Sequence, residues 1–247
     1  MRVQAIISYD GSKFQGIQSQ PHKLTIQDNI EFALNKLNIN SKINYAGRTD
    51  TGVHALNQSI DFLIPPYWNN LDKLKDSLNK IIFPSIYIKK IKVVNNNFHS
   101  RFLATKRSYR YLITNQYTPF NANYTLYKKT LDIKLMQKAI KLFEGKHNFE
   151  YFCKTGSEVN SYEREIYKTN IILYKNYAII KFVGNGFLRS QIRMMTQFLL
   201  DISDKNLTIK DLELQLQKKE KISTKLTIPN GLYFERVYYE KNFDNRR

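Results

Sequence analysis

The order in which strand-like and helix-like apolar patterns follow one another is the feature that most constrains the fold. Residues 3–9 form a short apolar run, and residues 26–37 carry apolar side chains at helical spacing behind a predicted cap at Thr25. Further apolar segments predict strands at residues 43–46 and 59–64, a helix at residues 71–81 and a strand at residues 86–94. This β-α-β-β-α-β order is typical of the ferredoxin-like arrangement.

A similar order begins again after Asn95-Asn96-Asn97. It predicts a strand at residues 103–114, a helix at 133–143, a hairpin of 166–174 with 177–183, helices at 187–202 and 208–217, and a closing strand at 232–240. We therefore predict an α+β protein of two ferredoxin-like halves, residues 1–100 and 101–247. Their sheets would join side by side around a central cleft, where sites commonly form.

The charge balance indicates a polyanionic partner. The 247 residues include 39 Lys and Arg against 21 Asp and Glu, a net charge of +18. Such an excess opposes folding by self-repulsion, so it favours binding to a nucleic acid or an anionic membrane surface. A compositional drift toward Lys, Asn and Ile would explain Lys in place of Arg, but not the shortage of acidic residues.

Several classes of site are disfavoured. Cys153 is the only cysteine, which excludes an intramolecular disulfide, and we expect it to be a small core residue. The four histidines show no metal-ligand spacing, so we expect no metal. No apolar run approaches the roughly 20 residues of a membrane span, and the start of the chain does not resemble a signal peptide. We expect a cytoplasmic protein with no membrane partner.

A glycine-bounded loop, Gly47-Arg48-Thr49-Asp50-Thr51-Gly52, follows the predicted strand at residues 43–46. Glycines allow a tight bend and a close approach of a ligand. Local chemistry leaves two interpretations open: an ordinary Asx-turn with Arg48 in solvent, or a functional carboxylate at Asp50. His54 follows the loop, and we expect it to be a structural hydrogen-bonding residue rather than an acid or base.

Tyr109 lies in the predicted strand at residues 103–114. Strand alternation puts Tyr109 and Tyr111 on one face with Arg107, and Arg110 on the other. Aromatic rings beside cations suit stacked bases above a phosphate-binding surface. The alternative is an ordinary strand with aromatic cross-strand pairs.

Arg189 and Arg193 are four residues apart in the predicted helix at residues 187–202. On one face near a helix N-terminus, two cations are unfavourable unless an anion faces them. Asp50 is the obvious carboxylate candidate. Two solvated arginines are the alternative.

Six motifs in order resemble the tRNA pseudouridine synthase A family over nearly the whole chain. They are Tyr9-Asp10-Gly11-Ser12-Lys13-Phe14-Gln15-Gly16, Thr25-Ile26-Gln27, residues 47–55 with the Gly-Arg-Thr-Asp signature, Phe98-His99-Ser100-Arg101-Phe102, residues 187–193, and Gly231-Leu232-Tyr233-Phe234. Two positions depart from the family pattern: Thr51 stands where alanine is usual, and Ile17 where tryptophan is usual.

The resemblance implies an enzyme that converts uridine to pseudouridine in tRNA, breaking the N-glycosidic bond and rejoining the base through C5. Members of the family act at positions 38 to 40 of the anticodon stem-loop, use neither cofactor nor metal, and are homodimers. It implies a catalytic role for Asp50, as a nucleophile at ribose C1′ or uracil C6, or as a base. Tyr109 would stack on the flipped uracil and help to remove the C5 proton.

The resemblance also implies supporting roles. Arg193 would pair with Asp50 and keep it ionised. Arg48 would fill the vacated place in the base stack or hold a flanking phosphate. Gly47, Thr49, Gly52 and His54 would support the loop.

Two other functions are compatible with parts of the sequence. One is a catalytically inactive tRNA-binding or tRNA-folding protein of the same fold, which the presence of Asp50, Tyr109 and Arg193 disfavours. The other is a DNA-binding protein, which would be expected to show a helix-turn-helix, zinc-finger or homeodomain pattern. We see none of these.

Overall fold

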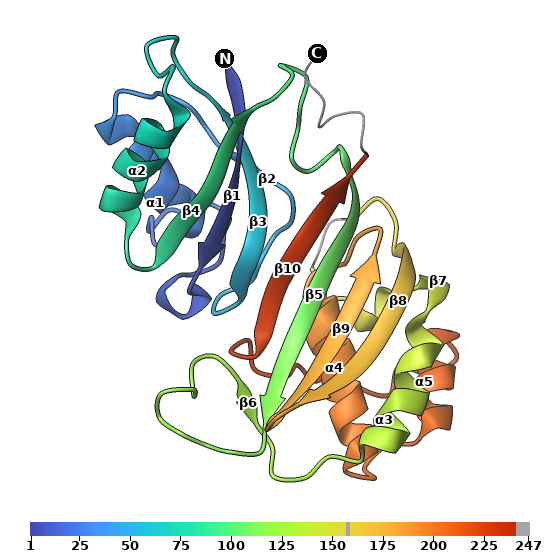
Figure 1. Cartoon of the computed structure of the whole chain (residues 1–247). Helices are drawn as coiled ribbons and strands as arrows, with labels where there is room; N and C mark the ends of the chain where they lie inside the picture. Colours follow the sequence, from blue (N-terminus) through green and yellow to red (C-terminus); the bar gives the residue numbers. More distant parts are fainter. Residues whose placement is uncertain (157–158, 241–247) are drawn as a thin grey trace. The chain divides into compact units, whose positions relative to one another are not determined.

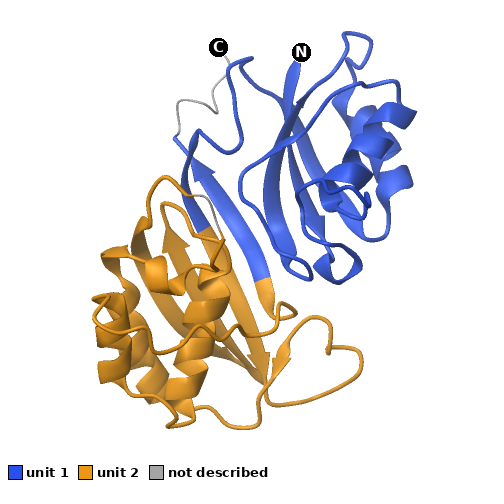
Figure 2. Ribbon diagram, turned by 180° about the vertical axis from the view of Figure 1, so that it is seen from behind, with its two compact units in different colours: residues 1–107, 233–247 blue, residues 108–232 orange. Residues whose placement is uncertain are grey.

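The computed structural model of the chain describes residues 1–156 and 159–240 (Figure 1). These residues fall into two compact units, shown in different colours in Figure 2. Unit 1 comprises Met1–Arg107 and the C-terminal segment from Tyr233, and unit 2 comprises Ser108–Leu232. The chain therefore returns to unit 1 for its last strand.

Unit 1 follows the predicted order of elements. In chain order these are β1 (Arg2–Tyr9), a 3₁₀ turn at Gly11–Lys13, α1 (Ile26–Lys36), β2 (Asn44–Tyr45), β3 (His54–Leu63), α2 (Leu71–Ile82) and β4 (Ile86–Val93), joined by β10 (Leu232–Tyr239). The strand order is β4-β1-β3-β10, and β2 also pairs with β3. The pairs β1–β3, β1–β4 and β2–β3 are antiparallel, whereas β3 and β10 are parallel.

The two helices of unit 1 pack on one side of its strands (Figure 1). Thr25 caps α1 as predicted, since its hydroxyl accepts a hydrogen bond from the Asp28 N–H. In α2 the buried stripe contains Leu74, Leu78 and Ile82. Ile81, the last residue of the helix predicted at residues 71–81, is exposed. The stripe follows steps of four residues here, so position 82 faces the strands.

A fully buried carboxylate of β3, that of Asp61, connects several segments of unit 1. Asp61 forms an ion pair with Arg2, and it accepts hydrogen bonds from the Asn44 amide at 2.9 Å and the Ser100 N–H at 2.7 Å. Ser100 belongs to the predicted 98–102 motif. The motif therefore has a structural use, because it supplies a donor to a carboxylate that burial would otherwise penalise.

Unit 2 contains the remaining elements. They are β5 (Ala104–Thr114, shared with unit 1), β6 (Leu126–Tyr127), α3 (Ile133–Ile140), a 3₁₀ turn at Lys141–Phe143, β7 (Gly145–Asn148), a 3₁₀ turn at Glu150–Phe152, β8 (Glu163–Tyr174), β9 (Tyr177–Gly184), α4 (Gln191–Ser203) and α5 (Ile209–Leu216). The strand order is β5-β9-β8-β7, with β6 parallel to β5. The sequence did not predict β6 and β7, because strands of two and four residues are too short to show a period.

The helices of unit 2 gather on one face of its strands (Figure 2). Aromatic rings fill the space between: Phe143 and Phe152 meet edge to face with centroids 5.5 Å apart, and Phe152 lies 5.8 Å from Phe198. Cys153 is buried and free, which confirms it as a core residue.

Helix α4 begins at Gln191, not at residue 187. Ser190 has a φ of 61°, a left-handed conformation that cannot belong to a right-handed helix. Arg189 therefore precedes the helix. The prediction that Arg189 and Arg193 lie together on one helical face is wrong.

Glu144, which immediately precedes β7, accepts hydrogen bonds from the Lys141 ammonium at 2.8 Å and from the Thr169 N–H and hydroxyl. Burial raises the pKa of this carboxyl, but these hydrogen bonds outweigh it and hold the pKa below its ordinary value.

Both units thus mix helices with mainly antiparallel strands, which confirms the α+β class. Within residues 1–156 and 159–240, no helix is both long and apolar enough to cross a membrane. The same residues contain no group of three or more His, Cys, Asp and Glu side chains that could hold a metal ion.

Candidate active site

The loop between β2 and β3 presents Asp50 beside a firmly anchored neighbour. Thr49 is buried, and its hydroxyl is hydrogen-bonded to the Tyr9 hydroxyl with the oxygens 2.8 Å apart. The Thr49 carbonyl accepts a hydrogen bond from the Ile17 N–H at 3.2 Å. Asp50 itself is partly exposed. The anchoring of Thr49 therefore fixes the backbone from which the Asp50 carboxylate projects.

Two further hydrogen bonds to backbone carbonyls fasten the loop, one from a backbone N–H and one from a side-chain amide. The Val53 N–H donates to the Asp50 carbonyl at 3.1 Å, and the Gln58 amide donates to the Gly47 carbonyl at 2.8 Å. Of the two glycines, Gly52 has a φ of 78°, whereas Gly47 is not among the residues with positive φ. Gly52 is thus the position that needs a glycine for its backbone conformation.

The segment after β1 packs directly on this loop. Gly16 has a φ of 83°, and a Cβ atom there would lie 2.7 Å from the Thr49 carbonyl oxygen. A Cβ atom at Gly11 would lie 2.0 Å from the Val53 carbonyl oxygen. Both glycines belong to the motif at residues 9–16, and their recurrence within that motif is the sequence signal of this close packing.

His54 is the first residue of β3 and is almost completely buried. Its Nδ1 accepts a hydrogen bond from the Gly11 N–H at 3.0 Å, and its ring stacks on Tyr233 with centroids 4.7 Å apart. These contacts agree with the structural role expected for His54.

Burial raises the pKa of Tyr9 to about 12, although hydrogen bonds with Thr49 and Gln58 oppose the shift. Its hydroxyl therefore stays protonated at neutral pH and serves as an anchor for Thr49. Arg48, in contrast, is exposed at the surface of the loop. It is accessible to a ligand that approaches Asp50.

Tyr109 and Arg193 lie in unit 2. Tyr109 is mostly buried in β5, and its ring meets Phe187 edge to face at 5.2 Å. Phe187 comes from the loop before α4, within the predicted 187–193 motif. The contact shows that this motif helps to fix the Tyr109 ring.

Arg193 lies in the first turn of α4, and its Nε donates to the Thr227 carbonyl at 2.7 Å. Thr227 also meets the Tyr111 hydroxyl at 2.8 Å. Burial raises the pKa of Tyr111, an effect that the nearby Arg193 charge partly opposes. The Arg193 Nε is therefore held by a neighbour in its own unit.

Arg48 and Asp50 belong to unit 1, and Tyr109 and Arg193 belong to unit 2. The structure brings Thr49, Gly52 and His54 together around Asp50. The pairing of Asp50 with Arg193 stays a prediction.

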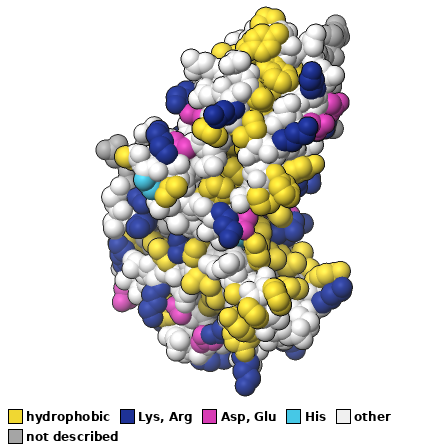
Figure 3. Space-filling model, turned by 90° about the vertical axis from the view of Figure 1, so that its left-hand side faces the viewer, with side chains coloured by type: hydrophobic (Ala, Val, Ile, Leu, Met, Phe, Trp, Pro, Cys, Tyr) yellow, Lys and Arg dark blue, Asp and Glu magenta, His cyan; other side chains and the backbone are white. Residues whose placement is uncertain are grey.

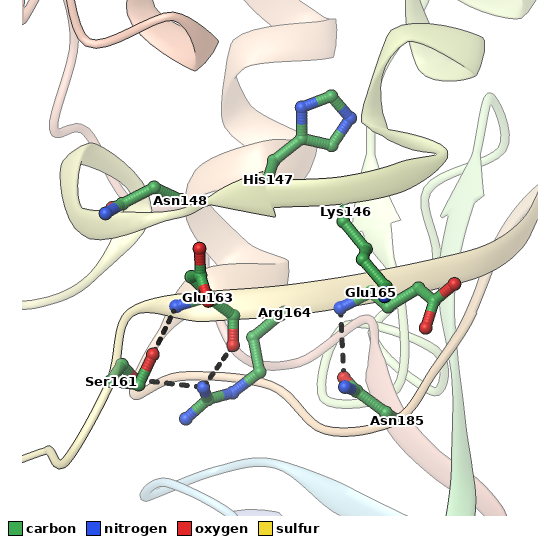
Figure 4. A pocket seen from close by; sticks show the side chains of 8 residues that line it. All are labelled: Lys146, His147, Asn148, Ser161, Glu163, Arg164, Glu165 and Asn185. Atoms are coloured by element: carbon green, nitrogen blue, oxygen red, sulfur yellow. Dashed lines mark hydrogen bonds between the residues drawn. The ribbon is translucent and has the colours of Figure 1, made fainter.

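A polar cavity of about 340 Å³ lies within unit 2 (Figure 4). It is lined by Lys146, His147, Asn148, Ser161, Glu163, Arg164, Glu165 and Asn185. The Arg164 Nη1 donates to the carbonyls of Ser161 and Glu163, and burial lowers the pKa of its guanidinium. Two carboxylates and two cations line the cavity, so its formal charge is balanced, and no predicted site residue lines it.

The family model described as tRNA pseudouridine synthase matches residues 5–102 and 139–240. Residues 103–138 are outside the match. The matched ranges contain the Asp50 loop and Arg193, but not Tyr109.

Two relatives show similarity over almost the whole chain. A tRNA pseudouridine synthase A of Campylobacter jejuni is 38% identical over 240 residues, which cover 97% of this chain and 100% of the relative. A tRNA pseudouridine synthase A of Helicobacter pylori is 40% identical over 242 residues, which cover 95% of this chain and 98% of the relative.

Among solved structures, a chain of a Cbf5-Nop10-Gar1 complex matches with a TM-score of 0.40 and 13% identity, covering 96% of this chain and 50% of that one. This likeness is too distant to support an argument. The family model and the two relatives are decisive, and the chain belongs to the tRNA pseudouridine synthase family.

Proposed function

We propose that this protein isomerises uridine to pseudouridine in tRNA. The N1–C1′ bond of the nucleotide breaks, a C5–C1′ bond forms, and the C5 proton is lost while N1 gains one. Substrate and product have the same atoms and oxidation state, so the reaction needs no oxidant, reductant or second substrate. Membership of the family supports this function.

The observation that carries the proposal is the presentation of Asp50. Its neighbour Thr49 is fastened by a buried hydroxyl contact and a backbone hydrogen bond, while Asp50 remains partly exposed. A carboxylate held in this way can reach a bound nucleotide without a large ordering cost. In our proposal Asp50 is the catalytic carboxylate, as a nucleophile at C1′ or C6, or as a base.

Three further residues have proposed roles around the extruded uridine. Tyr109 stacks on the uracil and assists removal of the C5 proton. Arg193 pairs with Asp50 and favours its charged form; its Nε is already used by the Thr227 carbonyl, so the pairing would fall to its terminal nitrogens. Arg48, which is exposed on the loop, fills the place in the base stack that the extruded uracil leaves, or it holds a flanking phosphate.

This proposal assigns residues 1–100 and 101–247 to two ferredoxin-like halves whose sheets join around the site. In unit 1 the β4-β1-β3 order with β2 beyond β3 supports the assignment for the first half. We further propose that the substrate uridines lie in the anticodon stem-loop, and that the enzyme is a cytoplasmic homodimer.

The surface charge supports an RNA partner. The net charge is +18, and Lys and Arg side chains outnumber Asp and Glu on the face drawn in Figure 3. Phosphate neutralisation by such side chains supplies most of the sequence-independent affinity for nucleic acids.

An Asp50→Asn variant separates the enzyme from an inactive tRNA-binding protein of the same fold. We expect pseudouridine formation in a tRNA transcript to be abolished, while the Kd for tRNA stays within about twofold. Asp76→Asn, at an exposed carboxylate of α2, is the matched control and should keep full activity. Appreciable turnover by Asp50→Asn would overturn the assignment of the catalytic carboxylate.

A further inference from the structure

The loop between β5 and β6 exposes large aromatic side chains. Phe120 is 90% exposed, Tyr117 62% and Tyr127 46%. The Tyr117 and Tyr127 rings contact each other edge to face, with centroids 5.8 Å apart. Exposed rings of this size cost free energy in water, and their clustering marks an interaction surface.

The turn between β8 and β9 extends this surface. The Asn176 amide donates to the Gln116 side chain at 2.7 Å, which holds the turn against the loop. The turn adds Tyr174, which is 59% exposed, and the Lys175 ammonium lies 5.5 Å from the centre of that ring. We define the β6 surface as Tyr117, Phe120, Tyr127, Lys129, Tyr174 and Lys175.

Hydrogen bonds hold the loop in one shape. The Thr118 N–H donates to the Asn121 side chain at 3.1 Å, and the Asn121 N–H donates to the Thr118 hydroxyl at 3.2 Å. The Asn230 amide donates to the Ala122 carbonyl at 3.0 Å, and the Lys128 N–H donates to the Thr114 carbonyl at 2.9 Å. The rings are thus presented on a fixed backbone, which reduces the entropy lost on binding.

The charge around these rings is positive. Residues 115–131 contain no Asp or Glu, and they include Lys128 and Lys129. Lys128 is paired with Asp204, whereas Lys129 and Lys175 are both exposed. Exposed aromatic rings between lysines, without nearby carboxylates in the loop, match the chemistry of a nucleotide: a flat base and an anionic phosphate.

We propose that the β6 surface binds unpaired bases of RNA, stacking them on Tyr117, Phe120, Tyr127 and Tyr174 while Lys129 and Lys175 face the phosphates. Bases that are already unpaired, in loops or at ends, can stack on such rings, whereas bases inside a duplex cannot. A second copy of this chain is disfavoured as the occupant of the β6 surface. A two-fold contact would set the lysines of this surface against the same lysines of the other copy, and residues 115–131 contain no Asp or Glu to compensate them.

The inference rests on the proposed function, which makes tRNA the RNA that meets this surface. It goes beyond that function because none of the residues proposed to act on the uridine belongs to the β6 surface. Tyr117, Phe120, Tyr127 and Lys129 lie outside the ranges that the family model matches, residues 5–102 and 139–240, whereas Tyr174 and Lys175 lie within them.

A Phe120→Trp variant tests stacking directly. We expect a short oligouridylate to quench the fluorescence added at position 120, after subtraction of the signal from Trp68, the chain's single tryptophan. An RNA duplex with the same number of phosphates should quench it much less. Phe32→Trp is the control, since Phe32 is also exposed and has the Lys36 ammonium 5.2 Å from its ring centre. Absence of quenching at position 120, or equal quenching by the duplex, overturns the proposal.

A Tyr117→Ser/Phe120→Ser variant tests the contribution to tRNA affinity. We expect the Kd for tRNA to rise about fivefold or more, because a stacked base usually contributes at least that factor. Phe32→Ser should leave the Kd unchanged. If the double variant instead changes only the oligomeric state in sedimentation equilibrium, the β6 surface is a contact between copies of the chain and the proposal is wrong.

Pseudouridine formation by the same wild-type preparation separates this inference from the proposed function. Normal isomerisation without quenching at position 120 refutes the stacking surface alone. Quenching without any isomerisation in tRNA refutes the proposed function and leaves an RNA-stacking surface.

Discussion

Replacing Gly16 with alanine tests whether contacts remote from the carboxylate position Asp50. Gly16 combines a φ of 83° with a backbone neighbour, the Thr49 carbonyl oxygen, only 2.7 Å from where a Cβ atom would lie. Gly156 is a matched control, because its φ is 74° and no atom of the described chain lies within 4 Å of its Cβ position. The two substitutions share backbone strain and differ in the steric overlap.

The backbone strain and the steric overlap together set the expected loss in the free energy of unfolding. Left-handed backbone costs an alanine about 1 kcal/mol or somewhat more, which is the whole effect expected for Gly156→Ala. Overpacking adds about 1–3 kcal/mol at Gly16, so we expect Gly16→Ala to lower the free energy of unfolding by about 2–4 kcal/mol. For a chain of this length that corresponds to a fall in Tm of about 4–16 °C.

The effect on catalysis is the decisive part. The Thr49 carbonyl must move by at least about 0.3 Å to restore the 3.0 Å minimum for a Cβ contact, and Asp50 is the next residue. Small displacements of reacting groups are costly, so we expect kcat to fall about tenfold or more, with a smaller change in KM.

Urea denaturation and single-turnover pseudouridine formation on a tRNA transcript measure the two effects separately. Gly156→Ala should lose stability without loss of kcat. If Gly16→Ala keeps the wild-type kcat while it is destabilised, the packing of Gly16 on Thr49 does not position the carboxylate.

Three other substitutions test distinct parts of the structure. Arg193→Lys should lower kcat about tenfold or more, because an ammonium cannot reproduce a guanidinium fork; an unchanged rate in steady-state assays would argue against the pairing with Asp50. Asp61→Asn should lower the free energy of unfolding by about 3–5 kcal/mol in urea titrations, since it removes the partner of Arg2 in a buried ion pair. Glu144→Gln should destabilise the protein at neutral pH but not in acid. The folded-state pKa of Glu144 lies below its ordinary value of 4.5, so the stabilisation is present above that pH and is lost as the pH falls through the folded-state pKa. Equal destabilisation at both pH values would contradict this assignment.

Local patterns in the sequence predicted most elements of the fold. The cap at Thr25 and the hairpin at residues 166–183 were predicted correctly because side-chain capping and strand alternation act over a few residues. The start of α4 was not, because nothing in the sequence around Ser190 indicated its left-handed backbone. The return of β10 to unit 1 was also missed, since pairing between residues so far apart leaves no local pattern.

The candidate site shows the same limit. The motif around Asp50 identified the loop, but the support from Gly16 and Tyr9 depends on contacts between separate segments. The sequence shows Gly11 and Gly16 without indicating which carbonyl oxygen each would approach. The structure supplies that information.

The return of the last strand to unit 1 has a consequence for how the protein is made. Tyr233, which stacks on His54 beside the Asp50 loop, leaves the ribosome only after all of unit 2 has been synthesised. At about 5–20 residues per second, the roughly 125 residues of unit 2 take about 6–25 s to translate. During that interval β3 lacks its parallel partner and His54 lacks its stacking partner. A nascent or prematurely terminated chain therefore carries the Asp50 loop without its finished surroundings, so the proposed active site can be completed only at the end of translation.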